Sequence, residues 1–286
     1  MQAIRSNFIT NKELKAYAFL KSKIINSNYS SINILCDTNT KKLCLSTLLD
    51  ELKDLNYQFN IIEIPHGEIN KSIESSQYIW KSLLENNCDR KALLINLGGG
   101  MITDIGGYVA SVYKRGISFI NIPTTLLAMV DAGIGGKTGI NFNNVKNVLG
   151  SFSLPETTII DTSYISTLDK REILNGYAEM LKHGLIAYKN HWAEMVICNP
   201  ITIGYDEIEH SIAIKSEIVS TDFKESNIRK TLNFGHTIGH GIESYFIDYE
   251  PAKSLKHGES VAFGILLESF LSVQLGYLQE QKFKEI

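Results

Sequence analysis

The chain has 286 residues, of which 44% are hydrophobic and 21% charged, and its formal net charge is −3. This length and composition allow a globular protein with one or two substantial cores. A slightly negative chain has no overall field that would hold nucleic acid or an anionic membrane, so we expect neither as a partner and expect any anion site to be built locally.

The N-terminal segment and the cysteines favour a cytoplasmic protein. The segment MQAIRSNFITNKELKAY contains no apolar core ahead of a small-residue cleavage site, so it is not a secretory signal. No apolar run approaches the ~18 residues of a membrane span. The four cysteines are scattered without a CxxC pair, which indicates free thiols in a reducing compartment.

Strand-like and helix-like segments alternate through the first half of the chain. Short apolar runs predict strands over residues 32–37, 60–65, 91–100 and 118–123. Helical periodicity between them covers residues 41–55, 69–87 and 101–115. Short apolar strands separated by helices favour a parallel sheet that is covered on both faces.

After the strand-like stretch 157–165 the remaining segments are helical, over residues 171–189, 205–223, 229–246 and 259–278. We therefore expect an α/β domain over residues 1–155 and an α-helical domain over residues 156–286. Residues 139–147, GINFNNVKN, are rich in Asn and Gly and are interpreted as a loop between the domains, where a ligand would sit.

Two glycine-rich stretches are candidates for anion binding. Glycines 98–100 separate a buried strand from a helix, which exposes backbone N–H groups and the positive helix end, and Asp104 lies one turn further on. In residues 129–150, glycines separate Asp131, Lys137, Lys146 and Asn147. A lysine on such a loop neutralises a phosphate or carboxylate. Neither stretch has the spacing of a dinucleotide fingerprint or a P-loop, so a tight turn and a surface loop stay open as alternatives.

Three segments offer metal ligands. Glu179 lies in an otherwise apolar helix, where a carboxylate needs a partner, either a metal ion or Lys182 one turn on. His236 and His240 are four residues apart, so both imidazoles lie on one helical face, and His257 begins the next helical segment. Such a set suits a catalytic zinc site with an open position. The spacing does not decide between that site, an ion pair and structural histidines.

Together these segments resemble 3-dehydroquinate synthase, one of the sugar phosphate cyclases. The motifs are NLGGGMITDIGGYVASVYKRG, IPTTLLAMVDAGIGGKTGINFNNVKN, GYAEMLKHG, IRKTLNFGHTIGH and LKHGES. They span residues 96–260 in the family's order, and HGEINKS upstream also fits. Agreement of several independent motifs in one order makes the resemblance highly specific.

The resemblance implies an NAD-binding α/β domain, an α-helical metal-binding domain, an active site between them and a homodimer. It implies conversion of 3-deoxy-D-arabino-heptulosonate 7-phosphate to 3-dehydroquinate and phosphate, with bound NAD⁺ and a divalent metal, zinc or cobalt. In that reaction NAD⁺ oxidises a ring hydroxyl, phosphate leaves, the hydride is returned, and an aldol step closes the carbocycle. NAD is regenerated in every turnover.

The resemblance also implies roles for individual residues, carried over by position. The implied metal ligands are Glu179, His236 and His257, which leaves His240 to face the substrate. The implied substrate and catalytic residues are Asp131, Lys137, Asn147, Lys182, Lys215, Glu225, Arg229, Asn233 and His240, with Arg115 reaching the phosphate across the dimer. The implied cofactor-binding residues are Asp37, Glu68, Lys71, Gly99, Gly100, Asp104, Thr124, Thr125, Lys146 and Thr167. His183 occupies a variable position of the family and is not expected to bind the metal.

The chain departs from the family's pattern in two places. It ends at EQKFKEI, where the family continues through further helices that supply another phosphate-binding lysine. We therefore expect exposed apolar surface and a phosphate that is incompletely held. The interval between His240 and His257 is long and is expected to form a loop of its own.

Three alternatives stay open. Another sugar phosphate cyclase would share the cofactor, metal and mechanism but take a different substrate. A metal-dependent alcohol or glycerol dehydrogenase would release NADH and would not need Lys137, Asn147, Lys215 and Arg229 together. The short C-terminus also fits an inactive homologue that only binds its ligands.

Overall fold

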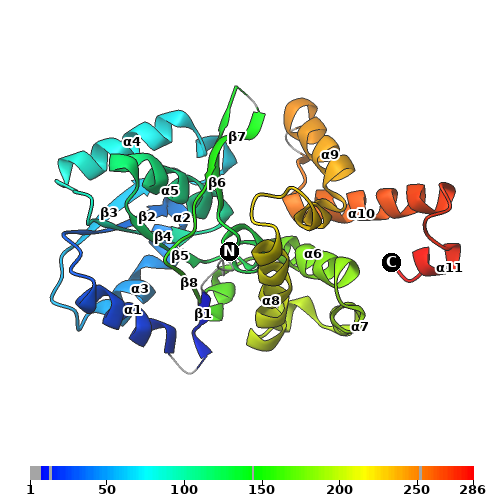
Figure 1. Ribbon diagram of the computed structural model, residues 1–286, viewed down its shortest axis with the longest axis horizontal. Helices are drawn as coiled ribbons and strands as arrows, with labels where there is room; N and C mark the ends of the chain where they lie inside the picture. The colour runs from blue at the N-terminus through cyan, green and yellow to red at the C-terminus, as the bar shows by residue number, and fades with distance from the viewer. Residues whose placement is uncertain (1–7, 13–14, 144, 251–252) are drawn as a thin grey trace.

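The computed structural model describes residues 8–12, 15–143, 145–250 and 253–286, and it consists of two unlike halves (Figure 1). The first half is built on a six-stranded sheet, and the second half is helical. The expected α/β domain followed by an α-helical domain is therefore confirmed as the fold class.

The six-stranded sheet is parallel throughout, in the order β1–β8–β5–β4–β2–β3. Its strands are β1 (Phe8–Thr10), β2 (Ile32–Asp37), β3 (Phe59–Ile64), β4 (Leu93–Gly98), β5 (Ser118–Pro123) and β8 (Thr157–Ile160). Every residue of β2, β4 and β8 is buried, as parallel strands covered on both faces require. β8 lies beyond residue 155 and still belongs to this sheet. The domain boundary expected after residue 155 stays a prediction.

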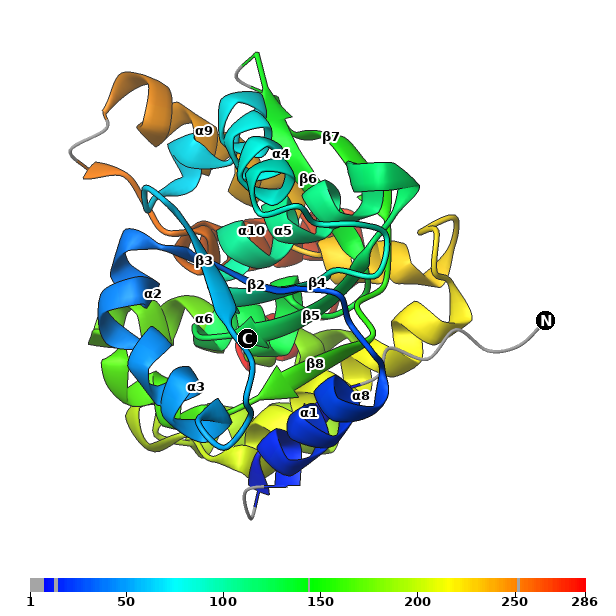
Figure 2. The same cartoon turned by 90° about the vertical axis from the view of Figure 1, so that its left-hand side faces the viewer.

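Helices cover both faces of this sheet (Figure 2). One core packs α1 (Lys15–Asn26) and α3 (Leu45–Leu52) against the sheet, and the other packs α4 (Ile73–Glu85) and α5 (Gly100–Val112) against its opposite face. The single helix expected over 41–55 is wrong, because the chain breaks at Cys44 between α2 (Thr38–Leu43) and α3. The carboxyl ends of β2, β4 and β5 meet at one edge, where ligands of parallel sheets bind.

Residues 139–147 do not form the expected loop. They belong to an antiparallel hairpin of β6 (Lys137–Phe142) and β7 (Val145–Phe152), which is separate from the main sheet. Gly139 and Gly150 face each other, and a Cβ on Gly150 would lie 2.4 Å from the Thr138 carbonyl oxygen. The glycines thus serve close strand approach, which the composition alone does not distinguish from a loop. The hairpin stands between the two halves (Figure 1).

The helical half contains α6 (Lys170–Ile186), α7 (Lys189–Ile197), α8 (Tyr205–Thr221), α9 (His236–Tyr249), α10 (His257–Gln274) and α11 (Glu280–Phe283). α6 is buried on most sides and lies at the centre. The helix expected over 229–246 is instead a 3₁₀ turn, Ile228–Asn233, followed by α9, because Gly235 adopts a φ of 80° between them. The loop expected after His240 is wrong up to Tyr249, which ends α9, and residues 251–252 lie outside the described part. α10 exposes the apolar surface that was expected, including Phe263, Leu267 and Phe270.

Candidate metal and substrate site

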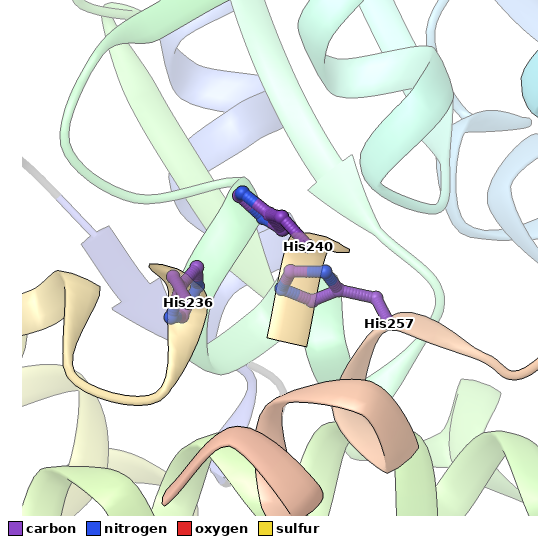
Figure 3. Close-up of side chains that lie close together, drawn as sticks. All are labelled: His236, His240 and His257. Atoms are coloured by element: carbon purple, nitrogen blue, oxygen red, sulfur yellow. The ribbon is translucent and has the colours of Figure 1, made fainter. Parts of the chain in front are cut away.

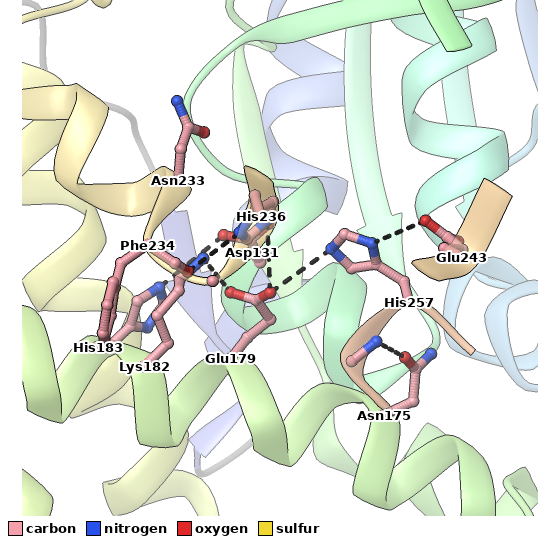
Figure 4. Close-up of polar contacts among 12 residues, drawn as sticks. Asp131, Asn175, Glu179, Lys182, His183, Asn233, Phe234, His236, Glu243 and His257 are labelled. Carbon is pink, nitrogen blue, oxygen red and sulfur yellow. Dashed lines mark hydrogen bonds and ion pairs between the residues drawn. The ribbon is translucent and has the colours of Figure 1, made fainter. Parts of the chain in front are cut away.

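Ligand-type side chains from three helices converge beside the start of α9 (Figures 3 and 4). Glu179 in α6 is fully buried, and its Oε1 lies 3.8 Å from His236 Nε2 and 3.5 Å from His257 Nε2. The ring centroids of His236 and His240 are 5.1 Å apart, and those of His240 and His257 are 5.6 Å apart. The fold therefore gathers the three expected ligands, with His240 at their side.

Contacts between α6 and α10 place His257 next to Glu179. The side-chain oxygen of Asn175 accepts a hydrogen bond of 2.7 Å from the Gly258 N–H, at the first turn of α10 (Figure 4). Lys256, which precedes that turn, forms an ion pair of 2.5 Å with Glu172. These contacts satisfy an N–H that would otherwise be unpaired at the helix start and fix the first turn of α10 on α6.

The start of α9 is held by α10. Both oxygens of the Glu268 carboxylate accept backbone hydrogen bonds there, from the N–H of Gly235 at 2.8 Å and of Ile238 at 3.2 Å. A carboxylate at a helix N-terminus satisfies unpaired donors and opposes the positive helix end. Gly264 allows this approach, because a Cβ there would lie 1.8 Å from the Gly235 carbonyl oxygen. His236, the first residue of α9, is oriented by these contacts.

The charges of this cluster are strongly coupled. Burial raises the pKa of Glu179, but Lys182 outweighs it and holds the pKa of that carboxyl far below its ordinary value. Burial and the nearby Lys182 lower the pKa of His236 to about 4. Burial also lowers the pKa of His257, yet its contacts with Glu179 and Glu243 raise it to about 9. With no metal bound, the His257 proton thus supplies a positive charge that the carboxylates favour.

The cluster fits a divalent transition metal. Both carboxylate oxygens of Glu179 are buried: Oε2 pairs with Lys182, and Oε1, which faces the histidines, accepts no hydrogen bond from any residue that the structure describes. One nitrogen each of His236, His240 and His257 lies within 4.8 Å of the others. Imidazole nitrogen and carboxylate oxygen form the ligand set of catalytic zinc sites. Lys182 compensates the charge of this buried carboxylate, and Glu179 Oε1 stays directed at the histidine nitrogens, so the donor set matches the implied metal.

Asp131 joins this cluster from the α/β half. Its Oδ1 accepts a hydrogen bond of 2.6 Å from Lys215 Nζ, and it lies 3.9 Å from Nε2 of the buried His183. Asp131 lies in a single π-helical turn, Ala128–Ala132, a feature often found at functional sites. Although burial raises the pKa of Asp131, Lys215 and Lys182 hold it well below its ordinary value. His183 donates or accepts at Ser211, 2.7 Å away, and so has a structural partner.

A second group of expected residues lies around Glu225. Its carboxylate pairs with Lys137 at 2.5 Å and accepts a hydrogen bond of 3.0 Å from Asn233. Glu225 and Asn233 line a cavity of about 650 Å³ next to α9. Arg229 is buried, and its guanidinium donates to the carbonyls of Gly135, at 3.0 Å, and Phe223. In this structure Arg229 therefore fixes the turn that leads to Lys137.

A third group joins the sheet edge to the hairpin. The buried Lys71 donates to Asp104 at 2.6 Å and to Asn147 at 2.5 Å. Glu68 lies 3.7 Å from Lys71 and accepts a hydrogen bond of 2.9 Å from Asn141 in β6. Asn147 was expected to contact substrate, but here it contacts Lys71, one of the expected cofactor residues.

The remaining expected cofactor residues lie mostly where parallel strands end. Asp37 ends β2, Gly99 and Gly100 begin α5 after β4, and Thr124 follows β5. The Asp37 carboxylate caps α2 by accepting from two backbone N–H groups. Thr125 Oγ1 accepts from the Ala128 N–H, and Thr167 Oγ1 donates to the Tyr164 carbonyl. These residues surround the sheet edge but already have local partners.

Two expected residues lie apart from these groups. Arg115 is exposed beyond the C-terminal end of α5, opposite the end that carries Gly99. Its expected action across a dimer stays a prediction. Lys146 pairs with Glu243 of α9 at 2.8 Å, and Glu243 lies 3.7 Å from His257 Nδ1. Lys146 therefore contacts the metal-side helices.

Sequence reasoning missed three residues that support the site: Glu243, Glu268 and Asp222. Glu243 had a signal, because it lies seven residues after His236 on the same helical face. Glu268 had none, since it accepts from backbone 30 and 33 residues away, whereas Asp222 accepts from the loop that directly follows it. The Asp222 carboxylate accepts from the N–H groups of Asn227, at 2.6 Å, and Arg229, at 3.1 Å, and so shapes the loop that carries Glu225.

The parallel α/β half, the helical half and the glutamate–histidine cluster between them define a chain of the sugar phosphate cyclase type. Two family models match consecutive stretches, 3-dehydroquinate synthase N-terminal over residues 61–175 and 3-dehydroquinate synthase C-terminal over residues 176–286. The chain belongs to the 3-dehydroquinate synthase family.

Curated relatives agree over most of the chain. It is 43% identical over 279 residues to a 3-dehydroquinate synthase of Parabacteroides distasonis, which covers 96% of this chain and 77% of the relative. It is 44% identical over 238 residues to a 3-dehydroquinate synthase of Pyrococcus furiosus, covering 82% of this chain and 69% of the relative. The relatives are thus longer than this sequence.

Solved structures share the fold. The 2-epi-5-epi-valiolone synthase of Streptomyces hygroscopicus, with NAD⁺ and Zn²⁺ bound, superposes with a TM-score of 0.83 at 26% identity and covers 100% of this chain and 79% of its own. A glycerol dehydrogenase of Schizosaccharomyces pombe has a TM-score of 0.63 at 18% identity, covering 98% and 73% of the two chains, and shows the fold alone. Within the described residues, no helix has the length and apolarity to cross a membrane.

Proposed function

We propose that this chain converts 3-deoxy-D-arabino-heptulosonate 7-phosphate to 3-dehydroquinate and phosphate, with NAD and zinc or cobalt as cofactors. One observation carries the proposal. In a chain of this family, the buried Glu179 turns Oε1 towards His236 and His257 while its Oε2 pairs with Lys182, and Asp131 with Lys215 lies beside them. When bound, the metal would polarise a substrate hydroxyl and NAD would accept and return its hydride.

Glu179, His236 and His257 are the proposed metal ligands, each from a different helix. Lys182 pairs with Oε2 of Glu179, whereas His236 and His257 face Oε1 (Figure 4). His240 is proposed to contact the substrate rather than the metal. It is exposed, and burial with the nearby His257 lowers its pKa, so its neutral imidazole is available to accept a proton at neutral pH.

The cationic side chains are proposed to hold the substrate's carboxylate and phosphate. Lys215 is oriented by Asp131, and Lys137 is oriented by Glu225, which also fixes Asn233. Lysines held by carboxylates are preorganised and keep hydrogen-bond donors for a further anion. Arg229 is proposed to act with them, and this structure supports its part through the turn before Lys137.

The edge of the sheet is the proposed NAD site. Gly99 and Gly100 at the start of α5 present backbone N–H groups to a pyrophosphate, and Asp104 lies one turn further along α5, paired with Lys71. Asp37, Glu68, Thr124, Thr125, Lys146 and Thr167 complete the proposed set. NAD would thus lie between the sheet and the metal cluster.

The expected homodimer, with Arg115 acting in the neighbouring subunit, is part of the proposal, as is a cytoplasmic location. A dimer would place the Arg115 guanidinium near the substrate's phosphate. An Arg115→Ala chain should then have a raised KM, and sedimentation should give a mass of two chains. A monomer with full activity would contradict both parts.

The test of the function is phosphate release from the heptulosonate phosphate by metal-free protein supplied with zinc and a trace of NAD⁺. Release many times in excess of NAD⁺, without net NADH, is the expected result. NADH accumulation with simple polyols would identify a dehydrogenase, and release only from another sugar phosphate would identify a different cyclase. No turnover by zinc-loaded protein would identify an inactive homologue.

Two variants separate the roles of the histidines. His236→Ala should lose zinc, whereas His240→Ala should retain zinc and lose rate, because only the first is a proposed ligand. Metal analysis beside the phosphate assay distinguishes them. Equal loss of zinc in both variants would show that His240 is a ligand too.

A further inference from the structure

A second cluster of metal-ligand side chains lies between α7 and α8, on helices that carry none of the proposed metal ligands. His191 and Glu194 occupy one face of α7, and His210 reaches them from α8. His210 Nδ1 is 3.6 Å from Glu194 Oε2, and the rings of His191 and His210 meet edge to face with centroids 4.5 Å apart. One ligand atom from each of the three side chains lies within 4.8 Å of the others.

His191 is the unexpected member of this cluster. It is completely buried, and although the backbone of Met180 lies beside its ring, neither ring nitrogen makes a hydrogen bond of acceptable geometry with any residue that the structure describes. A buried polar ring without partners costs about 1 to 3 kcal/mol, so its presence calls for a compensating contact.

We propose that His191, Glu194 and His210 form a second site for a divalent transition metal of the zinc class, which fastens α7 to α8. Two imidazoles and one carboxylate are the donor set that zinc prefers, and water would complete a tetrahedral shell. The ligand atoms of a bound zinc lie closer to one another than the ligand atoms of these three side chains do in this structure. His210 and Glu194 are both exposed and so can turn towards the fixed, buried His191.

The site is separate from the Glu179 cluster. Its ligands come from α7 and α8, and the described ligands of the other cluster come from α6, α9 and α10. His183 of α6 lies 3.9 Å from Asp131, beside the first cluster, and 2.7 Å from Ser211 of α8, the helix that carries His210. α7 itself is held close to α6, because a Cβ on Gly184 would lie 2.7 Å from the Trp192 backbone. Metal at the second site would therefore fix α8, which carries Lys215, to α7.

The test counts zinc ions. Full-length metal-free protein is dialysed against buffered zinc chloride, and bound zinc is measured per chain by atomic absorption. The wild-type chain should bind two, and His210→Gln should bind one, because this substitution removes a ligand from an exposed position without touching the core. His66→Gln, an exposed histidine outside both clusters, is the matched control and should still bind two.

A second measurement assigns the ions to the two sites. The His236→Ala chain should also bind one zinc, and zinc should still raise its melting temperature, whereas the His210→Gln/His236→Ala chain should bind none and show no shift. Cobalt should give the visible absorption of a nitrogen–oxygen site in the His236→Ala chain. One zinc in the wild-type chain, or an unchanged count in His210→Gln, would overturn the proposal.

Discussion

Glu268 offers a direct test of how the helical half orients the metal ligands. The side chain belongs to α10, yet both of its oxygens accept hydrogen bonds from the backbone that begins α9. Glu268→Ala removes both bonds, and Glu268→Gln keeps one oxygen acceptor and places an amide donor opposite an N–H. The two substitutions therefore remove the contact completely or in part, and neither alters a proposed metal ligand.

The expected size follows from the geometry. A hydrogen bond to a charged group contributes about 1.5 to 3 kcal/mol, and water replaces part of it because Glu268 is only half-buried. We expect the free energy of unfolding to fall by about 2 to 4 kcal/mol in Glu268→Ala and by about 1 kcal/mol in Glu268→Gln. Loss of a contact that orients a ligand lowers metal affinity about 10- to 100-fold.

The assay combines urea unfolding of the metal-free chain with zinc titration against a competing chelator. Glu280→Gln is the control, because Glu280 makes only an exposed pair of 3.0 Å with Lys284 and should change neither quantity. If Glu268→Ala bound zinc as tightly as the wild-type chain, the orientation of His236 would not depend on Glu268 and the reasoning would be refuted.

Three further predictions address packing, a buried ion pair and pH. Gly264→Ala should push α10 away from the turn before α9, lowering the free energy of unfolding by about 1 to 3 kcal/mol and the zinc affinity with it; Gly241→Ala, in open space, should be neutral or stabilising by thermal unfolding. Lys71→Met should leave the Asp104 carboxylate unpaired and lower the free energy of unfolding, measured in urea, by about 2 to 4 kcal/mol. Adding Asp104→Asn should restore most of that free energy. If the effects of the two substitutions were strictly additive, the pairing would be contradicted. In the metal-free chain the folded state raises the pKa of His257 to about 9, so protonation of this ring stabilises the fold fully at pH values below the ordinary histidine pKa near 6.5. This stabilisation is lost as the pH rises through about 9. The melting temperature should therefore fall between those pH values in the wild-type chain and not in His257→Gln.

The fold class was predictable because hydrophobic periodicity reports burial directly. Strands such as β2 and β4 are apolar throughout, and no other element of that length and composition fits a buried sheet. The breaks were less predictable. Cys44 carries no helix-stopping signal. At Gly235 α10 packs so closely that a Cβ would lie 2.5 Å from Ile265, and this contact is not visible in the sequence. The hairpin was mistaken for a loop since paired glycines and a flexible tract have the same composition.

The candidate site was predictable as a set of residues and only partly as a geometry. Motif order brought Glu179, His236 and His257 to attention, and local spacing alone would have paired His236 with His240. What sequence could not supply was the assembly across helices. The ion pair between Lys137 and Glu225 joins residues 88 positions apart, and the contact of Lys215 with Asp131 joins residues 84 positions apart. Such contacts depend on how the two halves dock.

The β6–β7 hairpin has a thermodynamic consequence. Two consecutive residues of β7 bind different halves of the chain, with Asn147 accepting from Lys71 at the sheet edge and Lys146 pairing with Glu243 on α9. A ligand that draws Lys71 away from Asn147 changes the free energy of the hairpin and so the restraint on the helix that carries His236. Linkage is reciprocal, so metal at the helices must change affinity at the sheet edge by the same factor.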